Sequence, residues 1–178
     1  MSSPRKTGKG QGTGVLQMNR ILPTDVGPIA EPCAAQLGAL CWRMERGRLQ
    51  ILLITSRDTG RWVIPKGWPM AGKSMAEAAA IEAWEEAGVE GLVHDAAWGQ
   101  FRYDKAVAAA PSIPCIVSVF GLRVAQLRRR FPERKQRRRK WFSADQAQGL
   151  VAEAGLSALL RDIHANPAYL AAASLDPA

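Results

Sequence analysis

Several features that define whole classes of protein are missing from this chain of 178 residues. No run of about 18 consecutive apolar residues occurs, so we expect no transmembrane helix and no membrane partner. The first fourteen residues, MSSPRKTGKGQGTG, carry charge but no apolar segment, so we expect no secretory signal. The three cysteines, Cys33, Cys41 and Cys115, are scattered and lack metal-ligand spacing, which favours reduced thiols in a cytoplasmic protein.

Residue patterns typical of nucleophilic catalysis are also missing. Neither of the two histidines, His94 and His164, has a partner pattern, and no Ser/His/Asp or Cys/His arrangement stands out. No recognised RNA-binding module is present either. Both histidines are therefore interpreted as structural.

The composition predicts one folded domain with a positive surface. Apolar residues make up 47% of the chain, enough for a sizeable core, and the net charge is +8. Residues 1–32 are expected to form a flexible tail, because Gly, Ser, Thr, Pro and Lys dominate its first fourteen positions and bury little apolar area. Residues 33–178 are expected to form a single domain of undetermined oligomeric state.

The order of apolar runs predicts a mixed sheet flanked by helices, in the α/β or α+β class. Strands are expected at 35–44, 48–57, 61–65, 92–105, 112–127 and 140–143. Helices are expected between the third and fourth of these strands and from Ala144 to about His164.

The helix inside this sheet pattern carries an unusual concentration of acid. Ser74 and Glu77 form an S-x-x-E capping box that begins the helix, and Gly88 is a natural residue to end it. About 100° of the helical wheel then holds three glutamates. These are Glu82, Glu85 and Glu86. The opposite face, which is expected to approach the sheet closely because its residues are mostly small, carries Ala76, Ala80, Ala83, Trp84 and Ala87.

Local physics argues against this acidic face unless a cation is bound to it. Like charges three and four residues apart disfavour a helix by a few tenths of a kcal/mol, about 0.2–0.5 per pair, and the C-terminal half of the helix dipole also disfavours anions. A divalent cation would reverse the sign, because hard Mg²⁺ or Mn²⁺ prefers several carboxylate oxygens. The spacing alone leaves two alternatives open: a metal site and a solvated acidic face.

The order of residues around these glutamates resembles the signature of the Nudix hydrolases. That signature runs Gly, five residues, Glu, seven residues, Arg-Glu, an apolar residue, any residue, Glu-Glu, any residue, Gly and an apolar residue. Positions that match it without an insertion are Gly67, Glu82, Ala83, Glu85, Glu86, Gly88 and Val89. The resemblance implies a Nudix-type α/β/α sandwich across about 34–165. It also implies an Mg²⁺- or Mn²⁺-dependent hydrolase in which Glu82, Glu85, Glu86 and the backbone carbonyl of Lys66 contact the metal.

Two positions depart from the family pattern. Lys73 stands where the family has its first Glu, and Ile81 stands where it has Arg. Losing an acid and a base together leaves the local charge balance unchanged. An inactive, degenerate box is the alternative, and the retention of all three downstream glutamates argues against it.

Flanking residues narrow the resemblance. The stretch VIPKGWP before the box and RRRKWFSADQA after it are similar to the branch of diphosphoinositol polyphosphate phosphohydrolases and dinucleoside polyphosphate hydrolases. The resemblance implies a pyrophosphohydrolase of a nucleoside-diphosphate-linked compound, a dinucleoside polyphosphate or a diphosphoinositol. The alternative is a catalytically weak Nudix-fold module that binds a nucleotide or RNA.

A basic run from Arg128 to Lys140, RRRFPERKQRRRK, has nine Lys or Arg residues and one Glu. It is interpreted in three ways: a solvated loop, the rim of a pocket for a highly phosphorylated small molecule, or a contact for nucleic acid. Few aromatic residues lie inside the run, so a base-stacking platform is not evident and nucleic acid is not favoured. Candidate substrate-binding residues are Lys66, Arg61, Arg102, Lys105, Arg137 and Arg139.

Overall fold

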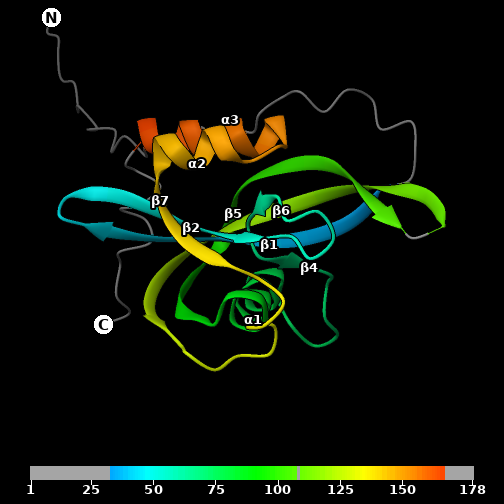
Figure 1. Ribbon diagram of the computed structural model, residues 1–178, viewed down its shortest axis with the longest axis horizontal. Helices are drawn as coiled ribbons and strands as arrows, with labels where there is room; N and C mark the ends of the chain where they lie inside the picture. Colours follow the sequence, from blue (N-terminus) through cyan, green and yellow to red (C-terminus); the bar gives the residue numbers. More distant parts are fainter. Residues whose placement is uncertain (1–32, 108, 167–178) are drawn as a thin grey trace, which may run out of the picture.

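The apolar runs form strands of one seven-stranded sheet in the computed structural model, which describes residues 33–107 and 109–166. In chain order the elements are β1 (Ala34–Glu45), β2 (Arg48–Thr55), β3 (Trp62–Val63), β4 (Lys66–Gly67), α1 (Met75–Ala87), β5 (Val89–Val107), β6 (Ala110–Leu127), β7 (Arg139–Ser143), α2 (Ala144–Leu150) and α3 (Ala154–Ala165) (Figure 1).

The sheet is mixed, as the sequence predicts. Its main path runs β3-β2-β1-β6-β5, with β4 paired to β1 and β7 paired to β2. Strands β1 and β6 are parallel, in a register that runs from Ala34 opposite Cys115 to Trp42 opposite Arg123. The pairs of β1 with β2 and of β5 with β6 are antiparallel. The short strand β4 is therefore held against the middle of the sheet by β1.

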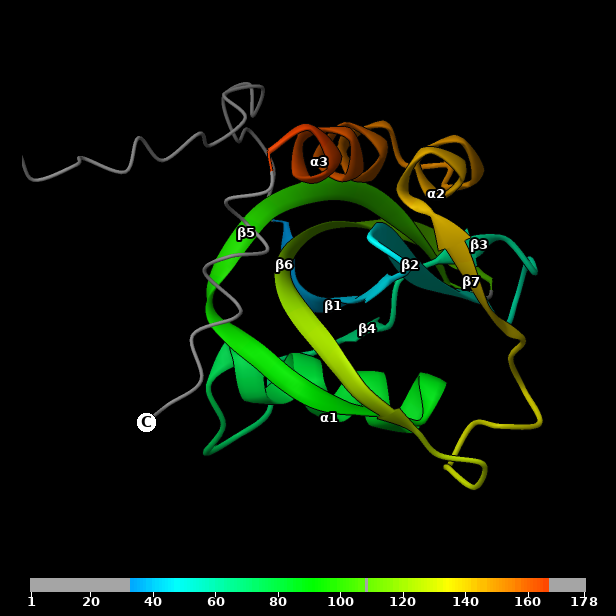
Figure 2. The ribbon, with the colours of Figure 1, turned by 90° about the vertical axis from the view of Figure 1, so that its left-hand side faces the viewer.

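Helices cover both faces of the sheet and give three layers (Figure 2). The face under α1 packs against its alanines, with Ala79 and Ala83 fully buried beside Leu37 and Leu52. The opposite face packs against α2 and α3 through a second apolar cluster. Small residues on α1 let this helix lie close to the sheet, so its glutamates come near β4.

The ends of α1 lie where the sequence predicts them. Ser74 accepts a hydrogen bond from the Glu77 amide while the Glu77 carboxylate accepts one from the Ser74 amide, which completes the capping box. Gly88 ends the helix in the left-handed conformation at φ 63°. One expectation for the faces was wrong: Trp84 is exposed rather than buried against the sheet.

Three differences separate this fold from the predicted one. Strand β4 was not expected, and β5 begins at Val89 directly after the helix instead of at 92. The predicted C-terminal helical region is two helices, α2 and α3. The predicted tail, residues 1–32, lies outside the described residues, and a single domain over 33–178 stays a prediction. No helix in the described part of the chain is long and apolar enough to cross a membrane.

Candidate active site

The candidate site lies where α1 meets the two-residue strand β4. Gly67 faces Glu82, and a Cβ at position 67 would overlap the Glu82 carboxylate. Only a glycine therefore lets this carboxylate lie against the backbone of β4. The family motif places a glycine and a glutamate at these two positions, and the fold explains the pairing sterically.

Glu86 joins the same helix to the same strand through hydrogen bonds. One carboxylate oxygen accepts a bond of 3.0 Å from the backbone amide of Lys66. The other oxygen contacts the guanidinium of Arg137. The side chains of Arg137 and Glu86 are only 7% and 10% exposed, so this is a buried ion pair. Both oxygens of Glu86 are thus engaged by the protein itself.

Burial and neighbouring carboxylates shift the pKa values of Glu82 and Glu86. Burial, together with the neighbouring carboxylates of Glu86, Glu85 and Glu133, raises the pKa of Glu82 to about 7. Burial also raises the pKa of Glu86, against the opposing effects of Arg137 and the Lys66 amide. The acidic face is therefore a place where negative charge is crowded and costly.

These carboxylates suit a divalent cation with one rearrangement. Among residues 33–107 and 109–166, no three His, Cys, Asp or Glu side chains are arranged to hold a metal ion. The side chains of Glu82 and Glu85 make no hydrogen bond or ion pair with any described residue, whereas both Glu86 oxygens are taken. Glu82 and Glu85 can therefore supply oxygen ligands directly, and Glu86 can join them by releasing Arg137.

Lys66 contributes a half-buried cation beside this site. Its ammonium lies 5.1 Å from the centre of the Tyr103 ring, and Tyr103 donates a 2.6 Å hydrogen bond to Gln36. Burial lowers the pKa of Lys66, while the charges of Glu86 and Glu153 oppose this shift. The predicted metal contact of its backbone carbonyl stays a prediction.

Among the other predicted substrate-binding cations, Lys105 and Arg61 lie on the side of Lys66, and Arg102 does not. Lys105 is close enough to affect the pKa of Lys66, and its ammonium lies 4.6 Å from the centre of the Trp68 ring. Arg61 lies 3.8 Å from Glu153, another group that acts on Lys66. Arg102 points to the other face of β5, where it donates to the Cys33 thiol at 3.0 Å. The structure therefore does not bring Arg102 together with Lys66 and Lys105.

The side chain of Arg137 is buried and Arg139 is half-buried, and both are held by contacts within the protein. Arg137 bridges Glu86 and Glu133, and it donates to the Thr55 carbonyl at 3.1 Å. Arg139 donates to the carbonyl oxygens of Ala87 and Arg128 at the C-terminal end of α1. Both arginines therefore organise the protein around the acidic face, and their predicted contact with substrate stays a prediction.

Comparison with known proteins assigns this arrangement to a family. The model of the NUDIX domain matches residues 34–163. The chain belongs to the Nudix family. Two curated relatives from Arabidopsis thaliana are "Nudix hydrolase 12, mitochondrial", 32% identical over 103 residues, and "Nudix hydrolase 4", 35% identical over 100 residues. Each match covers 56% of this chain and 51% or 46% of the relative, so the chain spans about half the length of these relatives.

Solved structures support the same Nudix fold. A C. elegans Ap4A hydrolase matches with a TM-score of 0.55 at 21% identity, over 75% of this chain and 98% of that one. The NUDIX domain of Shewanella oneidensis NrtR, complexed with ADP ribose, matches with a TM-score of 0.53 at 12% identity, over 78% and 93% of the two chains. At these identities the matches establish the fold alone.

The two departures from the Nudix motif have ordinary local surroundings. Lys73 lies 3.9 Å from Glu77 in an exposed ion pair at the start of α1. Ile81 is half-buried on the same helix. Glu82 still lies against Gly67, and Glu86 still accepts a hydrogen bond from the Lys66 amide, so the fold keeps both glutamates at β4 despite the two departures.

Several residues of the Nudix site could not be found from the sequence. Glu133 and Glu153 act on the charges of the site, yet neither belongs to a motif. Glu153 is nearly buried, and one of its oxygens has no hydrogen-bond partner among the described residues. Tyr103 shares the inner face of β5 with Phe101 and Lys105, and their alternation with the exposed Arg102 and Asp104 was the available signal.

Proposed function

We propose that this chain is a hydrolase that uses Mg²⁺ or Mn²⁺ to cleave a pyrophosphate bond in a phosphorylated small molecule. The observation that carries the proposal is the gathering of Glu82 and Glu86 of α1 against β4, where Gly67 leaves room for a carboxylate. Nothing in the packing of the helix requires three like charges there. A bound divalent cation would compensate the charge of these glutamates, which explains why they lie together.

Glu82, Glu85 and Glu86 would hold the divalent cation, with the Lys66 carbonyl as a further ligand. A cation bound there supplies neutralisation of phosphate charge, polarisation of the P–O bond and a lower pKa for bound water. Lys66 and Lys105 add positive charge beside this centre, and this charge attracts an anionic substrate. Arg137 keeps Glu86 compensated while no cation is bound, because an unpaired buried carboxylate would be costly.

The substrate is proposed from the sequence resemblance and from the relatives. The stretches VIPKGWP and RRRKWFSADQA resemble the branch that hydrolyses diphosphoinositol and dinucleoside polyphosphates. A solved Nudix structure of the same fold is named an Ap4A hydrolase. We therefore propose a dinucleoside polyphosphate, a diphosphoinositol or another nucleoside-diphosphate-linked compound.

The test is product release from a panel of these compounds, measured with Mg²⁺, with Mn²⁺ and with a chelator. We expect metal-dependent turnover of at least one compound. Glu86→Gln should lose most of it, about 100-fold or more, because Gln keeps the shape but removes the charge that holds the cation. Glu45→Gln is the matched control: it makes the same change at an exposed glutamate of the β1–β2 hairpin and should keep full turnover.

A second function is a binding module without turnover. It is favoured by one observation: both oxygens of Glu86 are already engaged by the Lys66 amide and Arg137. The NrtR domain of the same fold is described in complex with ADP ribose, which shows a ligand for that protein. Tight binding of a nucleotide with no metal-dependent product from the panel would favour this module and refute the hydrolase.

We also propose a cytoplasmic, reducing location. All three cysteines are free, and Cys41 and Cys115 are buried. Burial raises the pKa of the Cys41 thiol, so this thiol resists oxidation. Alkylation of the protein as it is isolated from cells should label Cys33 and find no disulfide; a disulfide-linked species would contradict the proposal.

A further inference from the structure

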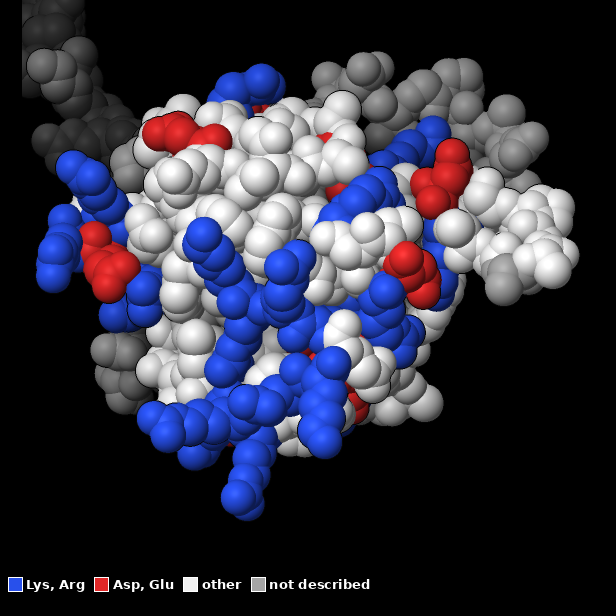
Figure 3. All heavy atoms as spheres, in the orientation of Figure 1, with Lys and Arg blue, Asp and Glu red and all other residues white. Residues whose placement is uncertain are grey.

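A hollow lies on the loop between β6 and β7, and none of the glutamates of α1 lines it. Its cavity has a volume of about 570 Å³ and is lined by Arg129, Arg130, Phe131, Pro132, Arg134, Lys135 and Gln136, here called the loop pocket. Four of these seven residues are cations and none is acidic, so the pocket favours an anion. Figure 3 shows Lys and Arg side chains gathered over the lower part of the molecule, where Figure 1 places this loop.

The only acid of the loop is turned away from the pocket. The Glu133 carboxylate bonds to Arg137 at 2.6 Å and lies 3.3 Å from Arg57, on the side of the candidate site. Arg129, Arg130, Arg134 and Lys135 make no ion pair with any described residue. The loop therefore has two sides. Glu133 and its arginine partners lie toward Glu86, whereas the four cations without an ion pair line the hollow.

The backbone of the loop is fixed, so these cations are presented by an organised surface. The amide of Arg128 donates to the Gly88 carbonyl at 2.7 Å, and the amide of Glu133 donates to the Glu85 carbonyl at 3.0 Å. Phe131 packs against Gly88, where a Cβ would overlap its ring. A loop that is already ordered loses less entropy when a ligand binds.

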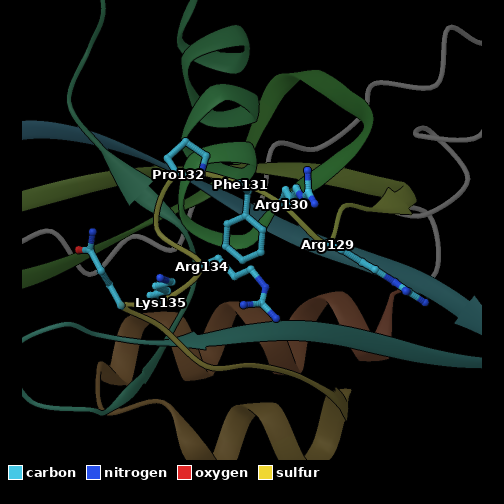
Figure 4. Close-up of a pocket in the computed structure, with 7 residues that line it drawn as sticks. Arg129, Arg130, Phe131, Pro132, Arg134 and Lys135 are labelled. Carbon is cyan, nitrogen blue, oxygen red and sulfur yellow. The ribbon is translucent and has the colours of Figure 1, made fainter.

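The arrangement of the cations suits a compact ligand with several phosphates. In Figure 4, Arg134 lies beside the Phe131 ring, with Arg130 and Arg129 to one side and Lys135 to the other. Guanidinium groups bind phosphate oxygens in pairs of hydrogen bonds. Burial lowers the pKa of Arg139 and the nearby charge of Arg134 lowers it further, so like charges lie close together here.

A small molecule fits this pocket better than RNA does. The volume falls within the range of about 300–1,000 Å³ that is usual for small-ligand sites. Phe131 is the one aromatic side chain of the pocket, and its ring already packs against Gly88 and lies 4.8 Å from the guanidinium of Arg139, so the pocket has no series of rings on which successive bases could stack. We propose that the loop pocket binds a compact anion that carries several phosphate groups, at a site separate from the carboxylates of α1.

The test is a calorimetric titration of the full chain with inorganic tripolyphosphate in the presence of a chelator, so that no metal links the anion to the glutamates. The double variant Arg130→Gln with Arg134→Gln should raise Kd by about tenfold or more, because two charge-assisted contacts are lost. The matched control is Arg46→Gln with Arg48→Gln, two exposed arginines of the β1–β2 hairpin, and it should change Kd by less than about twofold. Melting curves of both variants check that the fold is kept.

Two further arms decide where the anion binds and what it is. Lys66→Met should leave tripolyphosphate binding unchanged; loss of binding would place the anion at the candidate active site and overturn the proposal. Equal weakening by the two arginine pairs, or no binding by the wild type, would overturn it as well. A short single-stranded RNA that binds more tightly than tripolyphosphate, and that tripolyphosphate does not displace, would assign the surface to nucleic acid instead. Because the metal is absent, these results do not depend on hydrolysis.

Discussion

Arg137 is the built-in counter-charge of Glu86, and replacing it with Met provides a sharp test of the site. Met fills a similar length without a charge, so Arg137→Met leaves Glu86 buried and unpaired. The variant also loses the bonds of Arg137 to Glu133 and to the Thr55 carbonyl. We expect a large loss of stability in the absence of metal.

The magnitude follows from the burial of the pair. Breaking a buried ion pair by removing one partner costs about 3–5 kcal/mol, because the remaining charge is desolvated and uncompensated. For a domain of this size the cost corresponds to a fall in Tm of roughly 6–20 °C. The loss should shrink at low pH, because removing Arg137 raises the pKa of Glu86 further and a protonated Glu86 needs no counter-charge.

Urea unfolding with and without Mn²⁺ measures this prediction. Added Mn²⁺ should stabilise Arg137→Met more than it stabilises the wild type, because the cation replaces the missing guanidinium without having to displace it. The control is the double variant Arg137→Met with Glu86→Gln. It removes both charges of the buried pair, so it should regain much of the stability without metal. A loss below about 1 kcal/mol for the single variant, or equal stabilisation of both proteins by Mn²⁺, would refute the reasoning.

Three further predictions concern the same region. Gly67→Ala should keep the fold but lower kcat by about 100-fold, measured on whichever panel compound is turned over, because the new Cβ displaces the Glu82 carboxylate; unchanged kcat would contradict the steric argument. The pKa of Glu82 is raised to about 7 in the folded protein, so the metal-free folded state binds the extra proton and the free energy of unfolding should fall as pH rises from about 4.5 to 7. Urea titrations across that range should show a steeper decrease in the wild type than in Glu82→Gln, which keeps only the contribution of Glu86; parallel curves would contradict it. Arg139→Ala should lower stability by about 1–3 kcal/mol because it loses two hydrogen bonds to carbonyls, whereas exposed Arg138→Ala should not; equal melting temperatures for the two variants would contradict the structural role of Arg139.

The acidic helix was predictable because its determinants are local. Ser74, Glu77 and Gly88 fix both ends of α1 through contacts within a few residues, and the Nudix spacing places the three glutamates on one face. Trp84 was assigned to the face of α1 that packs against the sheet. A helical wheel gives the angle of a residue around the helix axis, but it does not give the width of the helix face that the sheet covers. The position of the sheet decides that width.

The partners of the glutamates were not predictable, because they come from distant parts of the chain. Arg137 lies 51 residues from Glu86 and 82 residues from Thr55. It belongs to the basic run that was interpreted as a solvated loop, a substrate rim or a nucleic-acid contact. The strand β4 has only two residues, and its pairing with Leu37 and Gly38 of β1 carries no periodic signal of its own. Local spacing predicts where the glutamates lie on α1, but only the tertiary fold shows that Arg137 is the counter-charge of Glu86.

The most direct test of the central claim is a titration of the protein with Mn²⁺, followed by the electron paramagnetic resonance signal of the free ion. The account predicts saturable binding in the wild type that is weakened by about tenfold or more in Glu82→Gln, since this side chain has no hydrogen bond or ion pair with residues 33–107 and 109–166 and would be a direct ligand. The matched change Glu45→Gln should bind Mn²⁺ as the wild type does. Equal binding by the wild type and Glu82→Gln, or no saturable binding by the wild type, would contradict the assignment of the acidic face as a metal site.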